Sequence, residues 1–154
     1  MRMAMFRRLV VPAVFLAGVA LTTGSVMAAS GTETFKADLS GMNQVPAVDT
    51  KGTGSATFRY NPTTHELTWT VTYKDLSSDV TAAHIHSGAA GANGKVVIPL
   101  TAKGATSNPS PIKGKATITD EQAMDLSSGN MYVNVHTTDH KGGEIRGQIM
   151  PSGM

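Results

Sequence analysis

The chain has 154 residues, no cysteine, and a formal net charge of +2 from 13 basic and 11 acidic residues. Without cysteine, disulfide frameworks and thiolate zinc sites are excluded, so any metal site must use histidine, carboxylate or methionine. Arg2, Arg7 and Arg8 lie in the first eight residues, and the remainder is nearly neutral with 10 basic and 11 acidic residues. This balance excludes the basic surface of a nucleic-acid-binding protein.

The N-terminal segment has the order of a secretory signal peptide. The charged stretch MRMAMFRR precedes the apolar LVVPAVFLAGVAL, and the small-residue stretch TTGSVMAAS follows. The apolar part covers 13 residues, whereas a membrane-spanning helix needs about 20, so we expect no permanent membrane anchor. Val26 and Ala28 occupy the −3 and −1 positions of a cleavage site. The sequence therefore predicts a signal peptide at residues 1–28 and one exported domain at 29–154, in the periplasm or secreted.

Strict alternation of apolar and polar residues predicts strands along the rest of the chain. The clearest case is ELTWTVTY at 66–73, and the preceding GSATFRYNP alternates in the same way. The intervening NPTTH has turn composition, so 54–73 is expected to be a hairpin. Further strands are expected at 34–39, 80–86, 95–100, 112–119, 131–136 and 144–150.

Two histidines lie one residue apart in the stretch TAAHIHSG. If 80–86 is a strand, His84 and His86 point to the same face, with Cα atoms about 6.5 to 7 Å apart. Two imidazoles at this spacing can bind one cation. The alternative is that both histidines simply bond to backbone groups and order the end of a strand.

The stretch SGAAGANGKVV follows these histidines and contains Gly94-Lys95. The spacing of a phosphate-binding loop is missing, and Val96 replaces its Ser or Thr. We expect a tight turn instead, in which Asn93-Gly94 adopts positive φ, while Gly88 and Gly91 let the loop pass close to the histidines.

The only helical pattern is TDEQAMDLSSGN, at 119–130. It offers Thr119 or Asp120 as N-cap, acidic residues in the first turn, and Gly129 as a stop signal. Short strands separated by Gly, Pro and Asn, with this one helix, predict an all-β fold: a Greek-key-like antiparallel β-sandwich with one short helix.

Further histidines lie in MYVNVHTTDH. In a strand at 131–136, Tyr132, Asn134 and His136 share the polar face, and His140 and Asp139 follow in a loop. If this strand neighbours 80–86, His84, His86 and His136 form a three-nitrogen site for Cu(II) or Zn(II), with His140 or Asp139 as additional ligands. His65, in a turn, is expected to be a solvated loop residue.

The C-terminal GGEIRGQIMP places Glu144 and Arg146 at strand spacing. This predicts either a same-face ion pair or two partners for backbone groups. A G-x-S-x-G nucleophile motif does not occur, and no Ser, His and Asp set stands out.

Three segments together resemble the CHRD domain family, named for chordin. They are ADLSGMNQVPAVDTKGTGSATFRYN, VTAAHIHSGAAGANGKVVIPL and GNMYVNVHTTDHKGGEIRGQI, and the resemblance spans about residues 33–150. It implies an extracellular or periplasmic β-rich module with no established reaction and, in larger animal proteins, roles in protein interaction. A looser similarity links the H-x-H strand to copper-zinc superoxide dismutase.

Three functions remain open at this point. The preferred one is an exported, non-enzymatic binding module that holds copper or zinc through a histidine cluster. The second is a copper-dependent oxidoreductase resembling superoxide dismutase, and the third is a metal-independent module that binds an extracellular protein partner. The partner, the metal, the oligomeric state and the choice between periplasm and cell exterior stay open.

Overall fold

The computed structural model describes residues 31–105 and 107–153. The predicted signal peptide lies outside the described residues. Among the residues described, no helix is long and apolar enough to cross a membrane. The described strands are β1 (Glu33–Ser40), β2 (Thr53–Asn61), β3 (Glu66–Lys74), β4 (Val80–Ser87), β5 (Val96–Pro99), β6 (Ile112–Thr117), β7 (Met131–Thr137), β8 (Ile145–Gln148) and β9 (Met150–Pro151).

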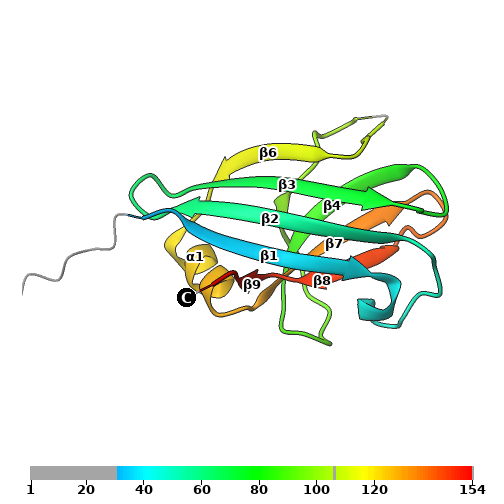
Figure 1. The fold of residues 1–154 in the computed structure, drawn as a ribbon, viewed down its shortest axis with the longest axis horizontal. Helices are drawn as coiled ribbons and strands as arrows, with labels where there is room; N and C mark the ends of the chain where they lie inside the picture. The colour runs from blue at the N-terminus through cyan, green and yellow to red at the C-terminus, as the bar shows by residue number, and fades with distance from the viewer. Residues whose placement is uncertain (1–30, 106, 154) are drawn as a thin grey trace, which may run out of the picture.

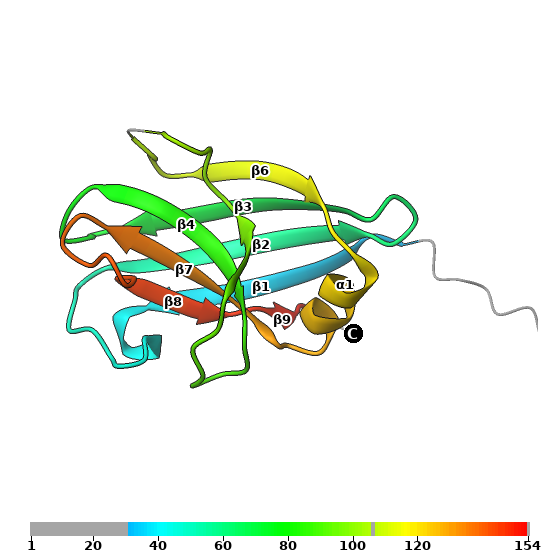
Figure 2. The same cartoon turned by 180° about the vertical axis from the view of Figure 1, so that it is seen from behind.

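All strands belong to one antiparallel sheet that folds over on itself. The order is β5-β4-β7-β8-β1-β2-β3-β6, and β9 also pairs with β1. Figure 1 shows β1, β2, β3 and β6 as one layer, and Figure 2 shows β4, β7 and β8 as the other. The predicted antiparallel β-sandwich is confirmed, in a nearly closed form whose layers are joined where β1 pairs with β8 and β9.

The apolar positions predicted from alternation fill the space between the layers. On the β2–β3 hairpin, every second side chain is buried, and Phe58, Leu67 and Val71 have no exposed surface. Trp69 lies opposite Gly114 of β6. Its Nε1 donates to the carbonyl of Leu100 just beyond β5, at 3.3 Å, so one hydrogen bond links β3 to the segment that follows β5.

The one α-helix of the described residues, α1 (Asp120–Ser127), forms where predicted. Thr119 is the N-cap and forms a capping box with Gln122, because each side chain bonds to the backbone N–H of the other residue. Gly129 adopts φ +70° just after the helix, the left-handed conformation that favours glycine. Leu126 is fully buried and anchors the helix on the sandwich.

The C-terminal strand departs from the prediction. The segment expected as one strand at 144–150 is divided into β8 and β9, which pair with β1 at Ser40 and at Phe35 and Lys36 respectively. Between them, the N–H of Ile149 donates to Met131 in β7. The segment thus forms hydrogen bonds with β1 and β7 in turn, and its pairing with β1 is interrupted between β8 and β9.

The outer face of the β4, β7 and β8 layer, which points away from the core, is polar as predicted, but part of it is buried. Tyr132 and Asn134 of β7 are buried because two loops lie over them. Gln44 of the 41–46 loop donates to Asn134 at 2.7 Å. Asn93 of the 88–94 loop donates to the carbonyl of Val45 at 2.8 Å, so the two covering loops are also bonded to each other.

Candidate metal centre

His84, His86 and His136, called here the three-histidine group, lie on the outer face of β4 and β7. Strand alternation directs His84 and His86 to the same side, while Ala83 and Ile85 are buried in the core. β4 and β7 are direct neighbours, with Ala82 opposite His136. The pairing therefore brings His136, 52 positions after His84, beside the histidine pair.

One ligand atom from each histidine lies within 4.8 Å of the others. The closest pair is His84 Nδ1 and His136 Nε2, at 3.1 Å. The ring centroids of His84 and His86 are 5.9 Å apart, and those of His86 and His136 are 6.1 Å apart. Within the described part of the chain, the group contains three imidazoles and no carboxylate.

Backbone carbonyls fix the orientation of two of these rings. His86 Nδ1 lies 2.9 Å from the carbonyl of Gly94, and His136 Nδ1 lies 2.9 Å from that of Lys141. A carbonyl only accepts, so both Nδ1 atoms carry the proton. Each Nε2 atom therefore carries a lone pair: that of His136 accepts from His84 Nδ1 at 3.1 Å, and that of His86 has no partner, so a metal would displace one hydrogen bond.

The Nε2 atom of His86 is the unusual polar atom of this group. His86 is 8 % exposed, and its Nε2 is buried without a hydrogen-bond partner in the described structure. Leaving such an atom unpaired costs about 1–3 kcal/mol. A cation bound between the rings would remove this cost.

Burial and the neighbouring rings favour the neutral forms of His84 and His136. Burial lowers the pKa of His84, and the neighbouring His136 and His86 lower it further. Burial lowers the pKa of His136 as well, against the opposing effect of its bond to Lys141. The rings of His84 and His136 are therefore in the form that binds metal at neutral pH.

The glycine loop reaches this arrangement by a different conformation from the predicted one. The expected positive-φ turn at Asn93-Gly94 is wrong, since neither residue has positive φ, whereas Gly91 has φ +79°. Gly94 is needed for a close approach instead, because a Cβ there would lie 1.5 Å from the carbonyl oxygen of Ser87. This approach places the Gly94 carbonyl at His86.

Two of the residues considered as additional ligands lie apart from the three-histidine group. His140 lines a separate hollow with Asp49, Thr50 and others, and is not among the grouped ligands. Asp139 is exposed, and its backbone N–H donates to Ser78. Both residues lie in the β7–β8 connection, after the end of the strand, where strand alternation no longer predicts the direction of a side chain.

His65 and Glu144 have structural partners. His65 lies at the hairpin turn, close to Tyr60 and 3.3 Å from Asp120. Glu144 and Arg146 form no ion pair with each other. Glu144 accepts from the backbone N–H of Ser77 and from the hydroxyls of Thr50, Ser77 and Thr137, while Arg146 donates to backbone carbonyls. Of the two predicted roles, partnership with backbone groups is the one observed.

Two residues beside the group were not identified from the sequence. The ring of Tyr132 stacks on His86, with centroids 4.9 Å apart and planes 12° from parallel. The guanidinium carbon of Arg146 lies 3.4 Å from the centroid of the same tyrosine ring. The register places Tyr132 opposite His86, so a correct prediction of the β4–β7 pairing would have identified this contact.

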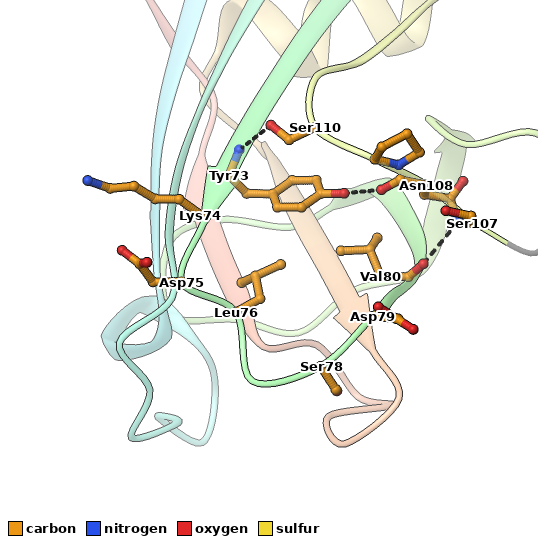
Figure 3. A pocket seen from close by; sticks show the side chains of 11 residues that line it. Tyr73, Lys74, Asp75, Leu76, Ser78, Asp79, Val80, Ser107, Asn108 and Ser110 are labelled. Atoms are coloured by element: carbon orange, nitrogen blue, oxygen red, sulfur yellow. Dashed lines mark hydrogen bonds between the residues drawn. The ribbon is translucent and has the colours of Figure 1, made fainter.

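A pocket of about 330 Å³ lies elsewhere, between the β3–β4 connection and the segment before β6. Figure 3 shows Tyr73 directed at Asn108 and bonded to its carbonyl. The amide of Asn108 donates to Val80. These bonds close a loop, and the lining contains no imidazole, so this pocket is distinct from the three-histidine group.

Comparison with known proteins identifies one family. The model of the CHRD domain matches residues 35–149, which is most of the chain. No curated protein and no solved structure matches it. The matched range includes the three histidines and the residues stacked on them.

Proposed function

The chain belongs to the CHRD domain family, and from this premise we propose that it is an exported binding module that holds one Cu(II) or Zn(II) ion through His84, His86 and His136. CHRD is an extracellular type of domain. The charged, apolar and small-residue order of the N-terminal segment supports export to the periplasm or the cell exterior.

The observation that carries the proposal is the orientation and burial of the ligand nitrogens. Carbonyl acceptors orient His86 and His136 so that both Nε2 lone pairs face the group, and the Nε2 atom of His86 is buried with no partner. His86 thus uses only one ring nitrogen, whereas most buried polar atoms in proteins have a hydrogen-bond partner. Three imidazole nitrogens, with water as a fourth ligand, suit Zn(II) and Cu(II).

The proposal is tested by titrating metal-free protein with Cu(II) and with Zn(II) in a calorimeter. One stoichiometric site is expected in the wild type, and it should be lost in His84→Ala, His86→Ala and His136→Ala. His65→Asn is the control, because asparagine tolerates the φ of +56° at this turn and His65 lies outside the group. Uptake no tighter in the wild type than in the three variants would show that the histidines are structural.

The same preparations distinguish the two other functions. A copper oxidoreductase requires the copper-loaded protein to accelerate superoxide decay and His84→Ala to abolish this activity. A metal-independent interaction module requires equal binding of its protein partner before and after chelation. We favour the metal-binding module because its evidence is the ligand geometry itself.

A further inference from the structure

Arg146 is a buried cation without a counter-ion. It is 2 % exposed, and neither ion pair of the described residues involves it. Its guanidinium donates to neutral acceptors: the side-chain oxygen of Asn93 at 3.1 Å and the carbonyls of Ala92 at 2.7 Å and Ala89 at 3.4 Å. Burying an uncompensated charge is costly, so its position calls for an explanation beyond loop closure.

The charge of Arg146 lies on a stack that ends at a candidate metal ligand. Tyr132 lies between the two, with the guanidinium on its ring and the imidazole of His86 also stacked against it. The Tyr132 hydroxyl accepts from the N–H of Gly94 at 3.1 Å, and the carbonyl of Gly94 accepts from His86. Tyr132 thus fixes both the plane of the His86 ring and the residue that orients it.

The nearest buried carboxylate along the strand does not neutralise this charge. Glu144 accepts hydrogen bonds from Thr50, Ser77 and Thr137. The three-histidine group adds no negative charge, since its ligands are neutral imidazoles. A metal in this group would therefore keep its full positive charge close to another buried positive charge.

We propose that Arg146, acting through Tyr132, is a positioning residue for His86 and biases the centre toward Cu(I) over Cu(II). This inference rests on the proposed copper site. The repulsion from a fixed cation is twice as large for a divalent ion as for a monovalent one, and burial weakens its screening. Reduction adds one electron to Cu(II), supplied by an electrode mediator in the test, and changes no bond within the protein.

The test measures the Kd for Cu(I) and for Cu(II) by competition with chelators of known affinity, together with the reduction potential of the bound copper. In Arg146→Gln, the ratio of the Cu(II) Kd to the Cu(I) Kd should fall about tenfold, and the potential should fall with it. Arg146→Lys keeps the charge and should retain the wild-type ratio, although both variants lose the bonds of the guanidinium fork.

Tyr132 is tested by a pair of variants. Tyr132→Phe keeps the stacked ring and should preserve most of the affinity, whereas Tyr132→Leu should weaken binding of both copper states by about tenfold to 100-fold, the usual effect of losing a group that orients a ligand. Equal losses in the two variants would contradict positioning through the ring.

Two variants at one surface position test the proposal even if Arg146→Gln does not fold. Ala90 is exposed on the covering loop and lines the same hollow as Arg146. Ala90→Glu brings a counter-charge to it and should shift the ratio in the same direction as Arg146→Gln, while Ala90→Gln should not. Lys115→Gln removes an exposed cation from β6 and is the distant control.

The outcomes separate the two proposals. If the wild type binds copper but neither Arg146→Gln nor Ala90→Glu changes the ratio, Arg146 serves only to hold the loop and the inference is wrong. If the wild type binds neither Cu(I) nor Cu(II), the proposed copper site fails as well, and if it also binds no Zn(II), so does the proposed function.

Discussion

At the scale of single residues, the candidate centre depends on which nitrogen of each ring is free. Gly94 determines this for His86, because its carbonyl accepts the Nδ1 proton and its lack of a side chain permits the approach to Ser87. The group therefore depends on a residue that is not itself a ligand.

Replacing Gly94 by alanine should weaken metal binding by about tenfold to 100-fold, as expected when a group that orients a ligand is displaced. The new Cβ would lie 1.5 Å from the Ser87 oxygen, so the loop must move and take the carbonyl with it. Calorimetric titration measures the change. Gly91→Asn is the control in the same loop, because that position has open space and a φ of +79° that asparagine accepts.

The lowered pKa values of His84 and His136 predict how the stability of the metal-free protein depends on pH. Both pKa values lie below the ordinary value near 6.5 because burial disfavours the charged rings. As pH falls through about 6.5, the unfolded chain takes up protons that the folded chain does not, so the free energy of unfolding decreases. Above that pH, these histidines add no pH dependence.

Urea unfolding at several values between about pH 7.5 and about pH 5.5 checks this expectation. The decrease should become shallower in His84→Gln and in His136→Gln, and should persist in His65→Asn. An equal slope in all four proteins would mean that the two rings titrate alike in the folded and unfolded chains.

At the scale of elements, Glu144 joins segments that are far apart in the sequence. Its carboxylate accepts from Thr50 in the β1–β2 connection, from Ser77 in the β3–β4 connection, and from Thr137 at the end of β7. Burial would raise the pKa of Glu144, but these hydrogen bonds outweigh it and lower the pKa overall. The carboxylate is therefore charged and ties one end of the sandwich together.

Glu144→Gln should lower the free energy of unfolding by about 1.5–3 kcal/mol. The carboxylate accepts hydrogen bonds at both oxygens, whereas the NH2 group of the amide only donates, so some of these bonds are lost. Chemical denaturation at neutral pH measures this loss. Glu66→Gln, which affects an exposed pair with Lys115, should change stability by less than about 1 kcal/mol. A comparable loss in both variants would remove the special role of Glu144.

The elements themselves were largely predictable, because each follows from a local pattern. Period-two alternation identifies the β2–β3 hairpin and places His84 and His86 on one face, and the cap at Thr119 locates α1. Which strands are neighbours was not predictable in this way. The 3.1 Å approach of His84 to His136 depends on the β4–β7 pairing, which the sequence analysis could only assume.

The remaining differences arise from contacts between distant segments. The burial of Asn134 requires the 41–46 loop to fold over the outer face, and no pattern within β7 contains that information. The stack of Arg146 on Tyr132 likewise joins residues of two paired strands. His140 was grouped with the other histidines by proximity in sequence, whereas the loop after β7 carries it to another hollow.

At the scale of the whole molecule, the three-histidine group exists only in the folded chain. His84 and His136 lie on different strands and are more than 50 residues apart, so the unfolded chain does not assemble the three rings. A ligand that binds only the folded state stabilises it by mass action.

Free Cu(II) or Zn(II) at about 100 times its Kd should therefore raise the free energy of unfolding by about 2.7 kcal/mol. The measurement is the Tm of metal-free and metal-loaded protein, with a chelator added last to show that the change is reversible. The Tm of His86→Ala should not respond to the metal. A rise of the same size in that variant would place the stabilising ion elsewhere.

The incomplete closure of the sheet leaves β5 and β6 as edge strands, each with one unpaired side. Exposed edges invite strands of other copies and so promote aggregation. Lys113 and Lys115 project from β6, so two copies pairing edge to edge would bring like charges together. β5 is only four residues long and ends in Pro99, which has no N–H to offer. The sandwich can thus remain open between β5 and β6 and still resist polymerising at high concentration.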